Sequence, residues 1–291
     1  MPKSHHDTEP QSTSTGHVLS SSTGHVLSSS KWLDTHFLAM QPEYEEMLRW
    51  VGIQPNWNVL DAACGGGSFL PLMIELVGAG GKVSAIDLAP ENVRTVQAKA
   101  VPNGWSNLTS VDVGSILALP YGDRSFDALW CANTMQYLSE EEVCTAIKEF
   151  RRVVRPGGLV AIKDYDPTGL QFFPLPYALG LRFFEATVRG GTQVGILRVP
   201  YLSQSMRSSG LVEVRQKPTL MLRFPPFREV EKKYLSDFFR QLAAQAAQTD
   251  LPLAEKAIWQ SLGDLDSADH ILNHPDFQFR AIQTVFVAQV P

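Results

Sequence analysis

The residues with the clearest chemical potential lie at 58–68, where an apolar stretch runs directly into a glycine-rich turn, NVLDAACGGGS. Glycines accept positive φ and let the backbone approach a ligand closely, and a helix beginning after them offers unpaired N–H groups to negative charge. Twenty residues after Gly67 stands Asp87, a carboxylate that suits the two hydroxyls of a ribose. Together, the turn and the acid predict a site for an adenosine-type cofactor.

Two unrelated kinds of adenosine site share these features, and the glycine spacing favours one of them. A dinucleotide site has the pattern G-x-G-x-x-G, in which the third glycine allows close packing of helix on strand. Here Gly65 and Gly67 supply the first two, and the third position is Leu70. The turn is instead entered through Asp61, which can organise it by accepting backbone N–H bonds. A dinucleotide-dependent oxidoreductase is therefore the less favoured alternative.

The elements around this motif alternate between strand-like and helix-like segments. Buried apolar strands that alternate with helices are typical of a parallel sheet covered on both faces. Ser139 and Glu142 predict a capping box for the last helix, and the Pro156-Gly157-Gly158 run ends it. The predicted strands are 58–62, 82–87, 108–111, 126–131 and 159–164, and the predicted helices are 42–52, 68–77, 90–100 and 139–154.

The remainder of the chain has a different texture. Two longer β-rich segments, separated by a helical stretch, predict an antiparallel pair added at one edge of the sheet. Residues 1–30 are rich in Ser and Thr, repeat TGHVLSSS in tandem, and are predicted to be a disordered leader. We expect one domain over 31–291. Its parts are N-terminal cap helices (31–56), a cofactor-binding core (57–164), and a substrate lid with C-terminal strands (165–291), in which the β segments are 212–223 and 279–290, the helix is 228–248, and the insertions are 165–205 and 225–275.

Composition excludes several classes of protein. The 25 Lys and Arg residues against 30 Asp and Glu give a formal net charge of −5, which disfavours nucleic acid as a partner. The three cysteines (Cys64, Cys131, Cys144) have neither the number for a disulfide framework nor the close spacing of a zinc site. No apolar run reaches about 18 residues, so stable membrane insertion is not expected. A cytoplasmic protein fits best, and a homo-oligomer is compatible with these features.

Histidine is absent from 37–269, so chemistry housed there lacks the commonest general base and transition-metal ligand. A base would be a carboxylate, a tyrosine, His36, one of the late histidines, or none. Asp164 and Asp166 follow the fifth strand and are the best-placed carboxylates; either could equally be a solvated loop acid. Metal dependence is not expected.

At this point the chain resembles the class I S-adenosylmethionine-dependent methyltransferases, particularly the branch of ubiquinone- and menaquinone-biosynthesis-type enzymes. The resemblance spans about 105 residues in four ordered blocks. These are 59–67, Asp87, Leu119-Pro120-Tyr121 with Ser125-Phe126-Asp127, and Arg151 to Leu159. It implies a Rossmann-like fold, with a mostly parallel seven-stranded sheet, an antiparallel edge and helical lid insertions.

The resemblance also implies roles for individual residues, with S-adenosylmethionine as the cofactor. Asp61, which organises the turn, belongs to the cofactor site, and Asp87 holds the ribose. The acid that usually contacts adenine is replaced by Ser115, with Asp112 a weaker substitute. The remaining implied contacts are Ala63, Gly65 and Gly67 to the methionine part, Leu88, Ser115 and Ile116 to adenine, and Asn133 to the methionine amino group.

The expected function is methyl transfer to a carbon, oxygen or nitrogen atom of an apolar or aromatic small molecule, such as a specialised metabolite or a quinone. The candidate catalytic residues are Tyr137, Asp164 and Tyr44. An aromatic pocket over the cofactor is predicted, although ordinary core packing is the competing interpretation for each aromatic residue. A relative that binds the cofactor without methylating also stays open. The aromatic candidates are Trp32, Phe37, Tyr44, Tyr165, Phe172, Phe173, Tyr177, Phe183 and Phe184.

Overall fold

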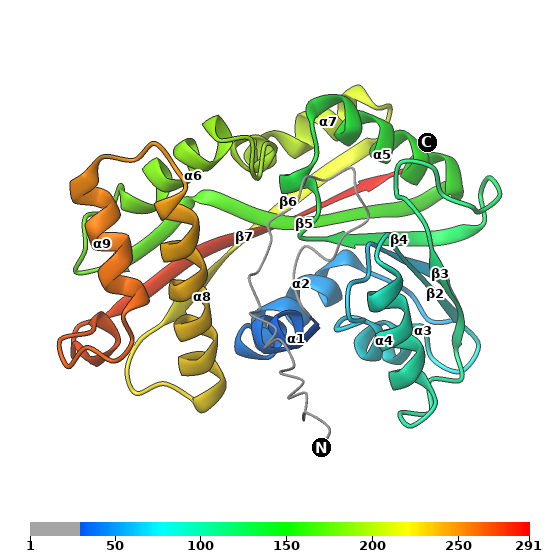
Figure 1. Ribbon diagram of the computed structural model, residues 1–291. Coiled ribbons are helices and arrows are strands. Elements are labelled where there is room, and N and C mark those ends of the chain that lie inside the picture. The colour runs from blue at the N-terminus through cyan, green and yellow to red at the C-terminus, as the bar shows by residue number, and fades with distance from the viewer. Residues whose placement is uncertain (1–29) are drawn as a thin grey trace, which may run out of the picture.

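A seven-stranded sheet in the order β3-β2-β1-β4-β5-β7-β6 organises the computed structural model, which describes residues 30–291 (Figure 1). The leader predicted at 1–30 lies outside this range except for Ser30, where helix α1 begins. β1 to β5 are mutually parallel, and β7 runs antiparallel to both of its neighbours, β5 and β6. The mostly parallel Rossmann-like sheet with an antiparallel edge is thus confirmed. The strands are β1 Asn58–Ala62, β2 Lys82–Asp87, β3 Leu108–Val113, β4 Phe126–Ala132, β5 Val154–Phe173, β6 Val212–Arg223 and β7 Gln278–Gln289.

Strand β5 is much longer than the sequence predicts. We expected strand only over 159–164, with 165–205 as an insertion, but β5 continues to Phe173. The reason is its partner: β7 pairs with it from Leu159↔Gln289 to Phe173↔Gln278, so the extra residues have backbone hydrogen-bond partners. β5, β6 and β7 therefore form an arm beyond the parallel core. Three helices pack around it (Figure 1): α6 Leu179–Arg189, α8 Glu229–Ala247 and α9 Leu253–Gly263.

The helices that the sequence predicts at 42–52, 68–77, 90–100, 139–154 and 228–248 begin and end close to those positions, because their boundary residues carry local signals. Helices α6 and α9 lie in the segments predicted as insertions, and α7 Leu202–Ser208 begins in one of them. Ser139 and Glu142 do form a reciprocal capping box at the start of α5. The α-helices are α1 Ser30–Ala39, α2 Gln41–Val51, α3 Leu70–Val77, α4 Pro90–Ala100, α5 Glu140–Val153, α6 Leu179–Arg189, α7 Leu202–Ser208, α8 Glu229–Ala247 and α9 Leu253–Gly263, and the short 3₁₀ helices are η1 Met135–Tyr137, η2 Ile196–Tyr201 and η3 Ile271–Asn273.

Replacing Ser139 by alanine is expected to lower the free energy of unfolding by about 1 kcal/mol, because the Glu142 N–H loses its acceptor. Chemical denaturation measures this. Ser106→Ala is the matched control: that hydroxyl is exposed and bonds only its neighbour Asn107, so we expect a change within about 0.5 kcal/mol. Equal losses in the two variants would contradict the capping role.

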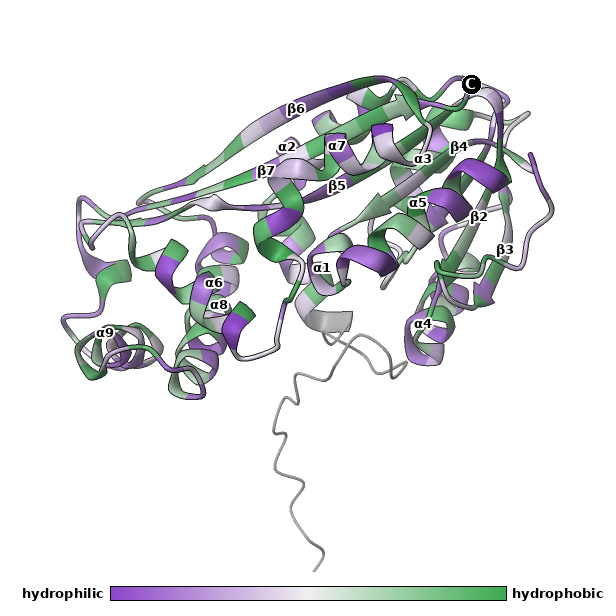
Figure 2. Cartoon of the chain, turned by 90° about the horizontal axis from the view of Figure 1, so that it is seen from above, coloured by the Kyte–Doolittle hydropathy of each residue, from purple (hydrophilic) through white to green (hydrophobic). Residues whose placement is uncertain are grey.

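The N-terminal helices are fastened to the C-terminal part of the chain by one buried arginine. Arg223 on β6 donates to both carboxylate oxygens of Glu43 on α2 (2.7 and 2.8 Å) and to the carbonyl of Ala39, where α1 ends. It also pairs with Glu231 on α8 at 2.9 Å. As a result α1 lies between α8 and α4 (Figures 1 and 2). The edge strand β6 is itself largely exposed and polar. Over residues 30–291, no helix combines the length and apolarity needed to cross a bilayer.

Candidate functional site

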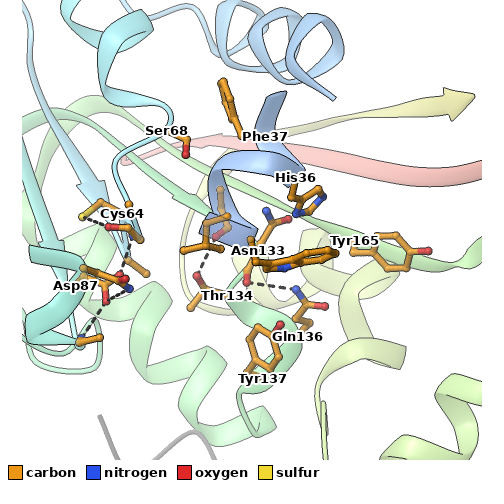
Figure 3. Close-up of a pocket in the computed structure, with 18 of the residues that line it drawn as sticks. His36, Phe37, Cys64, Ser68, Asp87, Asn133, Thr134, Gln136, Tyr137 and Tyr165 are labelled. Carbon is orange, nitrogen blue, oxygen red and sulfur yellow. Dashed lines mark hydrogen bonds between the residues drawn. The ribbon is translucent and has the colours of Figure 1, made fainter. Parts of the chain in front are cut away.

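A cavity of about 300 Å³ opens at the carboxyl ends of β1, β2 and β4. Ligands of open α/β sheets bind at this edge, where strand order reverses. One part of the cavity is lined by the glycine turn and by the residues at and after the ends of β2 and β3 (Figure 3). The lining residues of this part that the sequence predicts are Asp61, Ala63, Gly65, Asp87, Leu88, Ser115, Ile116 and Asn133.

Asp87 ties the glycine turn to the next helix. Its carboxylate accepts the backbone N–H of Gly65 at 2.8 Å and that of Ala89 at 2.9 Å, and the Asn92 side-chain amide at 2.9 Å. Gly65 has φ of +53°, a conformation that glycine adopts without a Cβ penalty. The acid is therefore held rigidly on the cavity wall.

Asp61 is a buried acid with one oxygen left unpartnered. It lines the cavity, and its Oδ2 has no hydrogen-bond partner within the described chain. Burial raises the pKa of Asp61 to about 8, and the nearby Asp87 carboxylate adds to the shift. A cation placed beside Asp61 would satisfy the free oxygen and restore ionisation, so the position suits an ammonium group.

Gly67 does not line the cavity. A Cβ there would meet Leu70 and Val96 within 3 Å, so its place in the motif reflects helix packing as well as its φ of +77°. Helix α1, which lies in the predicted N-terminal cap, contacts the turn from outside, and the sequence did not predict this contact. Lys99 Nζ donates to the Gly66 carbonyl at 3.0 Å and to Asp34 on α1 at 2.9 Å.

At the part of the cavity expected to hold adenine, the wall has Ser115 where the resemblance implied an acid. Ser115 lines the cavity, as do Ile116 and Leu117, and the Ser115 hydroxyl accepts the Leu117 N–H at 3.1 Å. Asp112, the weaker substitute, is not among the lining residues; it accepts the Tyr121 hydroxyl at 2.8 Å. The structure therefore brings Ser115, not Asp112, to this part of the cavity.

Asn133 is held in the left-handed region by a buried lysine. Its φ is +55°, its N–H donates to the Lys163 carbonyl, and its Oδ1 accepts Lys163 Nζ at 2.6 Å. The same Nζ lies 3.7 Å from the centre of the Tyr44 ring. Burial lowers the pKa of Lys163 well below its ordinary value. Lys163 thus positions two cavity residues; a lysine directly after the apolar run of 159–162 was the sequence signal for it.

Of the three candidate catalytic residues, Tyr44 and Tyr137 line the cavity and Asp164 does not. Asp164 is fully buried, and its two oxygens accept the Gln136 N–H at 3.1 Å and the Tyr165 N–H at 2.8 Å. Burial raises the pKa of Asp164 to about 6. Its geometry is that of a residue fixing the turn after β4. Asp166 is also absent from the lining and bonds Thr168.

His36 reaches the cavity although its sequence position lies outside the sheet region. Its Nε2 is 2.8 Å from the Tyr44 hydroxyl, and its ring stacks on Tyr234 with centroids 5.1 Å apart. Burial lowers the pKa of His36 to about 3, with the charge of Lys163 contributing, so the imidazole is neutral. The histidine-free stretch of sequence therefore did not leave the cavity without a histidine.

The part of the cavity beyond Asn133 is lined mainly by aromatic and glutamine side chains, and we call it the aromatic chamber. The aromatic candidates divide here: Phe172 and Phe183 pack in the core, and Tyr177 is exposed. Burial raises the pKa of Cys64 well above its ordinary value, which does not suit a nucleophile. Within residues 30–291, no three His, Cys, Asp or Glu side chains cluster as metal ligands do. The chamber is lined by Trp32, His36, Phe37, Tyr44, Phe69, Gln136, Tyr137, Tyr165, Phe184, Gln193, Ile196, Tyr234, Phe238, Gln241, Leu242, Gln245 and Gln283.

Comparison with known proteins identifies the core. Residues 59–158 match a family described as "Methyltransferase domain". The demethylmenaquinone methyltransferase of Staphylococcus aureus is 30% identical over 139 residues, 48% of this chain and 56% of that protein. The 2-phytyl-1,4-naphtoquinone methyltransferase of a Nostoc species is 28% identical over 130 residues, 44% of this chain and 56% of that protein. The chain thus spans about half the length of the curated relatives it matches.

Solved structures share the fold over most of the chain. The phosphoethanolamine N-methyltransferase 2 of Haemonchus contortus, in complex with S-adenosyl-L-methionine, aligns with a TM-score of 0.57 at 14% identity, covering 90% of this chain and 57% of that one. The [4+2]-cyclase SpnF aligns with a TM-score of 0.52 at 16% identity, covering 91% and 97%. At these identities the likeness concerns the fold, and the two proteins are named for different activities.

Proposed function

We propose that this chain, which carries a class I methyltransferase domain in its residues 59–158, transfers a methyl group from S-adenosylmethionine to an apolar or aromatic small molecule. The observation that carries the proposal is a single cavity that joins the glycine turn and its two acids to the aromatic chamber. A cofactor held at one end would present its reactive group to a substrate held at the other.

The residues present fit this cofactor. The unpartnered Oδ2 of Asp61 suits the ammonium of the methionine part. The rigid Asp87 carboxylate accepts three N–H donors and keeps one lone pair, on Oδ2, for a ribose hydroxyl. Leu88, Ser115 and Ile116 form the adenine end, and Asn133 lies where the cofactor end meets the chamber. When bound, the sulfonium supplies an activated methyl group.

The protein's own part in the reaction is mainly positioning. Methyl transfer is an in-line displacement, so holding the acceptor at the correct distance and angle accounts for much of the rate. Burial raises the pKa of Tyr44 well above its ordinary value, so its hydroxyl stays protonated. It lies on the wall, 2.8 Å from neutral His36, and we assign it to hold the methyl acceptor in position by a hydrogen bond. Tyr137 lines the same wall.

Equilibrium titration tests the proposal. We expect the purified chain to bind S-adenosylmethionine and S-adenosylhomocysteine, and not a nicotinamide dinucleotide, since Leu70 occupies the place of the third dinucleotide-site glycine. Absence of binding at millimolar S-adenosylmethionine would overturn it. Mass spectrometry of an acceptor gaining one methyl group separates methylation from another reaction run with the same cofactor bound.

Cofactor binding should release a proton from Asp61. In the free protein the Asp61 pKa of about 8 keeps the acid protonated at pH 6.5. The ligand's α-ammonium, with a pKa of about 8, is charged at that pH, so its approach lowers the Asp61 pKa and the carboxyl ionises. Affinity should therefore rise as pH increases from 6.5 towards 8.

Calorimetric titration in two buffers of different ionisation enthalpy measures the released proton. We expect close to one proton for the native chain at pH 6.5 and close to none for Asp61→Asn, which has no proton to lose. Asp112→Asn, an acid outside the cavity, should behave as the native chain. Equal proton release in all three proteins would contradict the role given to Asp61.

A further inference from the structure

The wall of the aromatic chamber carries no charged side chain. Among the described residues that line the whole cavity, the only acids are Asp61 and Asp87, both at the cofactor end, and there is no lysine or arginine. His36 is neutral because burial lowers its pKa. Burying an ion without a counter-charge is strongly unfavourable, so this wall disfavours ionised ligands.

The same wall contains two glutamines whose amide oxygens have no hydrogen-bond partner among the described residues. Gln283 is 2% exposed and lines the chamber, yet its Oε1 has no hydrogen-bond partner. The hydroxyl of Tyr165 and the Oε1 of Gln193 are buried without partners in the same way. A buried polar group left unpaired carries a free-energy penalty, which a ligand hydrogen bond would relieve.

Two of these groups are neighbours. Tyr165 on β5 and Gln283 on β7 face each other across the antiparallel pair, so their side chains lie on the same face of the sheet. Figure 3 shows the Tyr165 ring with its hydroxyl directed away from Cys64 and Asp87. The pair therefore marks the part of the chamber remote from the cofactor end.

We infer that Tyr165 and Gln283 form a hydroxyl-recognition site, and that the substrate is an uncharged, ring-containing molecule with a hydroxyl on the side opposite the methyl acceptor. A hydroxyl satisfies the pair in either orientation of the amide, because it both donates and accepts. Stacking surfaces at Trp32, Tyr234 and Phe238 hold the ring system. The inference rests on the proposed function for the position of the methyl acceptor.

Calorimetric titration with three naphthalene probes of similar size tests this. 2-Naphthol is neutral with a hydroxyl, 2-methoxynaphthalene is neutral without a donor, and 2-naphthoate is an anion. With the protein saturated by S-adenosylhomocysteine, we expect 2-naphthol to bind at least tenfold more tightly than either of the others. Gln283→Leu should remove this preference, and Tyr165→Phe, which deletes only the hydroxyl, should reduce it about threefold or more. Gln216→Leu, the same change on the exposed face of β6, should leave it intact.

Each outcome decides the matter. Failure of S-adenosylhomocysteine to bind would count against the proposed function, and the probes titrated against the cofactor-free protein would still report on the chamber. If the cofactor product binds, then absent 2-naphthol binding, equal affinity for 2-naphthoate, or an unchanged preference in both variants would overturn the hydroxyl site. Unaltered S-adenosylhomocysteine affinity in Gln283→Leu and Tyr165→Phe shows that the variants are folded.

Discussion

Replacing Asp87 by asparagine is expected to weaken S-adenosylhomocysteine binding by at least about 100-fold. The carboxylate accepts three N–H donors from Gly65, Ala89 and Asn92, and an asparagine amide would direct its own N–H against one of them. The substitution also removes the charge that favours a hydrogen bond from a ribose hydroxyl. Hydrogen bonds to a charged acceptor contribute about 1.5–3 kcal/mol each, so losing one to the ligand and one to the glycine turn gives the stated factor.

Asp112→Asn is the matched control for this prediction. Asp112 lies on the neighbouring strand β3, loses the same charge, and bonds Tyr121 outside the cavity. We expect its S-adenosylhomocysteine affinity to stay within about twofold of the native chain. Calorimetry gives both affinities, and far-ultraviolet circular dichroism shows that both variants are folded. Comparable weakening in the two variants would mean that net charge, not the position of Asp87, governs binding.

Replacing Tyr44 by phenylalanine is expected to lower kcat about 100-fold while S-adenosylhomocysteine affinity changes less than about twofold. The ring of Tyr44 and its contact with Lys163 are retained, so only the hydroxyl bonded to His36 is lost. Misplacement of the reacting atoms by about 1 Å can cost about 10²-fold in rate, so losing the hydrogen bond that positions the acceptor gives the stated factor. The rate is measured with the acceptor identified by product mass spectrometry.

Tyr121→Phe deletes a hydroxyl of the same kind outside the cavity, and we expect kcat to stay within about twofold of the native value. His36→Gln keeps a hydrogen bond to Tyr44 but replaces the imidazole that orients its hydroxyl. It should therefore lower kcat without raising KM in proportion. A Tyr44→Phe variant with unchanged kcat would reduce Tyr44 to a packing residue.

The aromatic chamber and the matched segment 59–158 come largely from different parts of the chain. The core residues that form the cofactor end lie within the matched family segment 59–158. The chamber is built chiefly from α1, β5 beyond Asp164, α6, α8 and β7, outside the segment matched by that family.

The sequence alone predicted most of the parallel core correctly. β1, β2, α4 and the capping box of α5 occur at the predicted residues, because each is specified by a contiguous signal such as an apolar run, Pro90 in the first helical turn, or the Ser139–Glu142 spacing. Strand β5 escaped prediction beyond Asp164, because its continuation depends on pairing with β7 more than 100 residues later.

The candidate site divides in the same way. The glycine turn and Asp87 could be identified from sequence because a strand, a turn and a helix in succession already fix their relative geometry. His36 beside Tyr44, Asp34 on Lys99, and Tyr165 opposite Gln283 are brought together only when α1 packs against α2 and α4 and β7 pairs with β5. Sequence determined where the cofactor end would be. Long-range packing decided which side chains face the substrate, since their separation along the chain carries no local signal of contact.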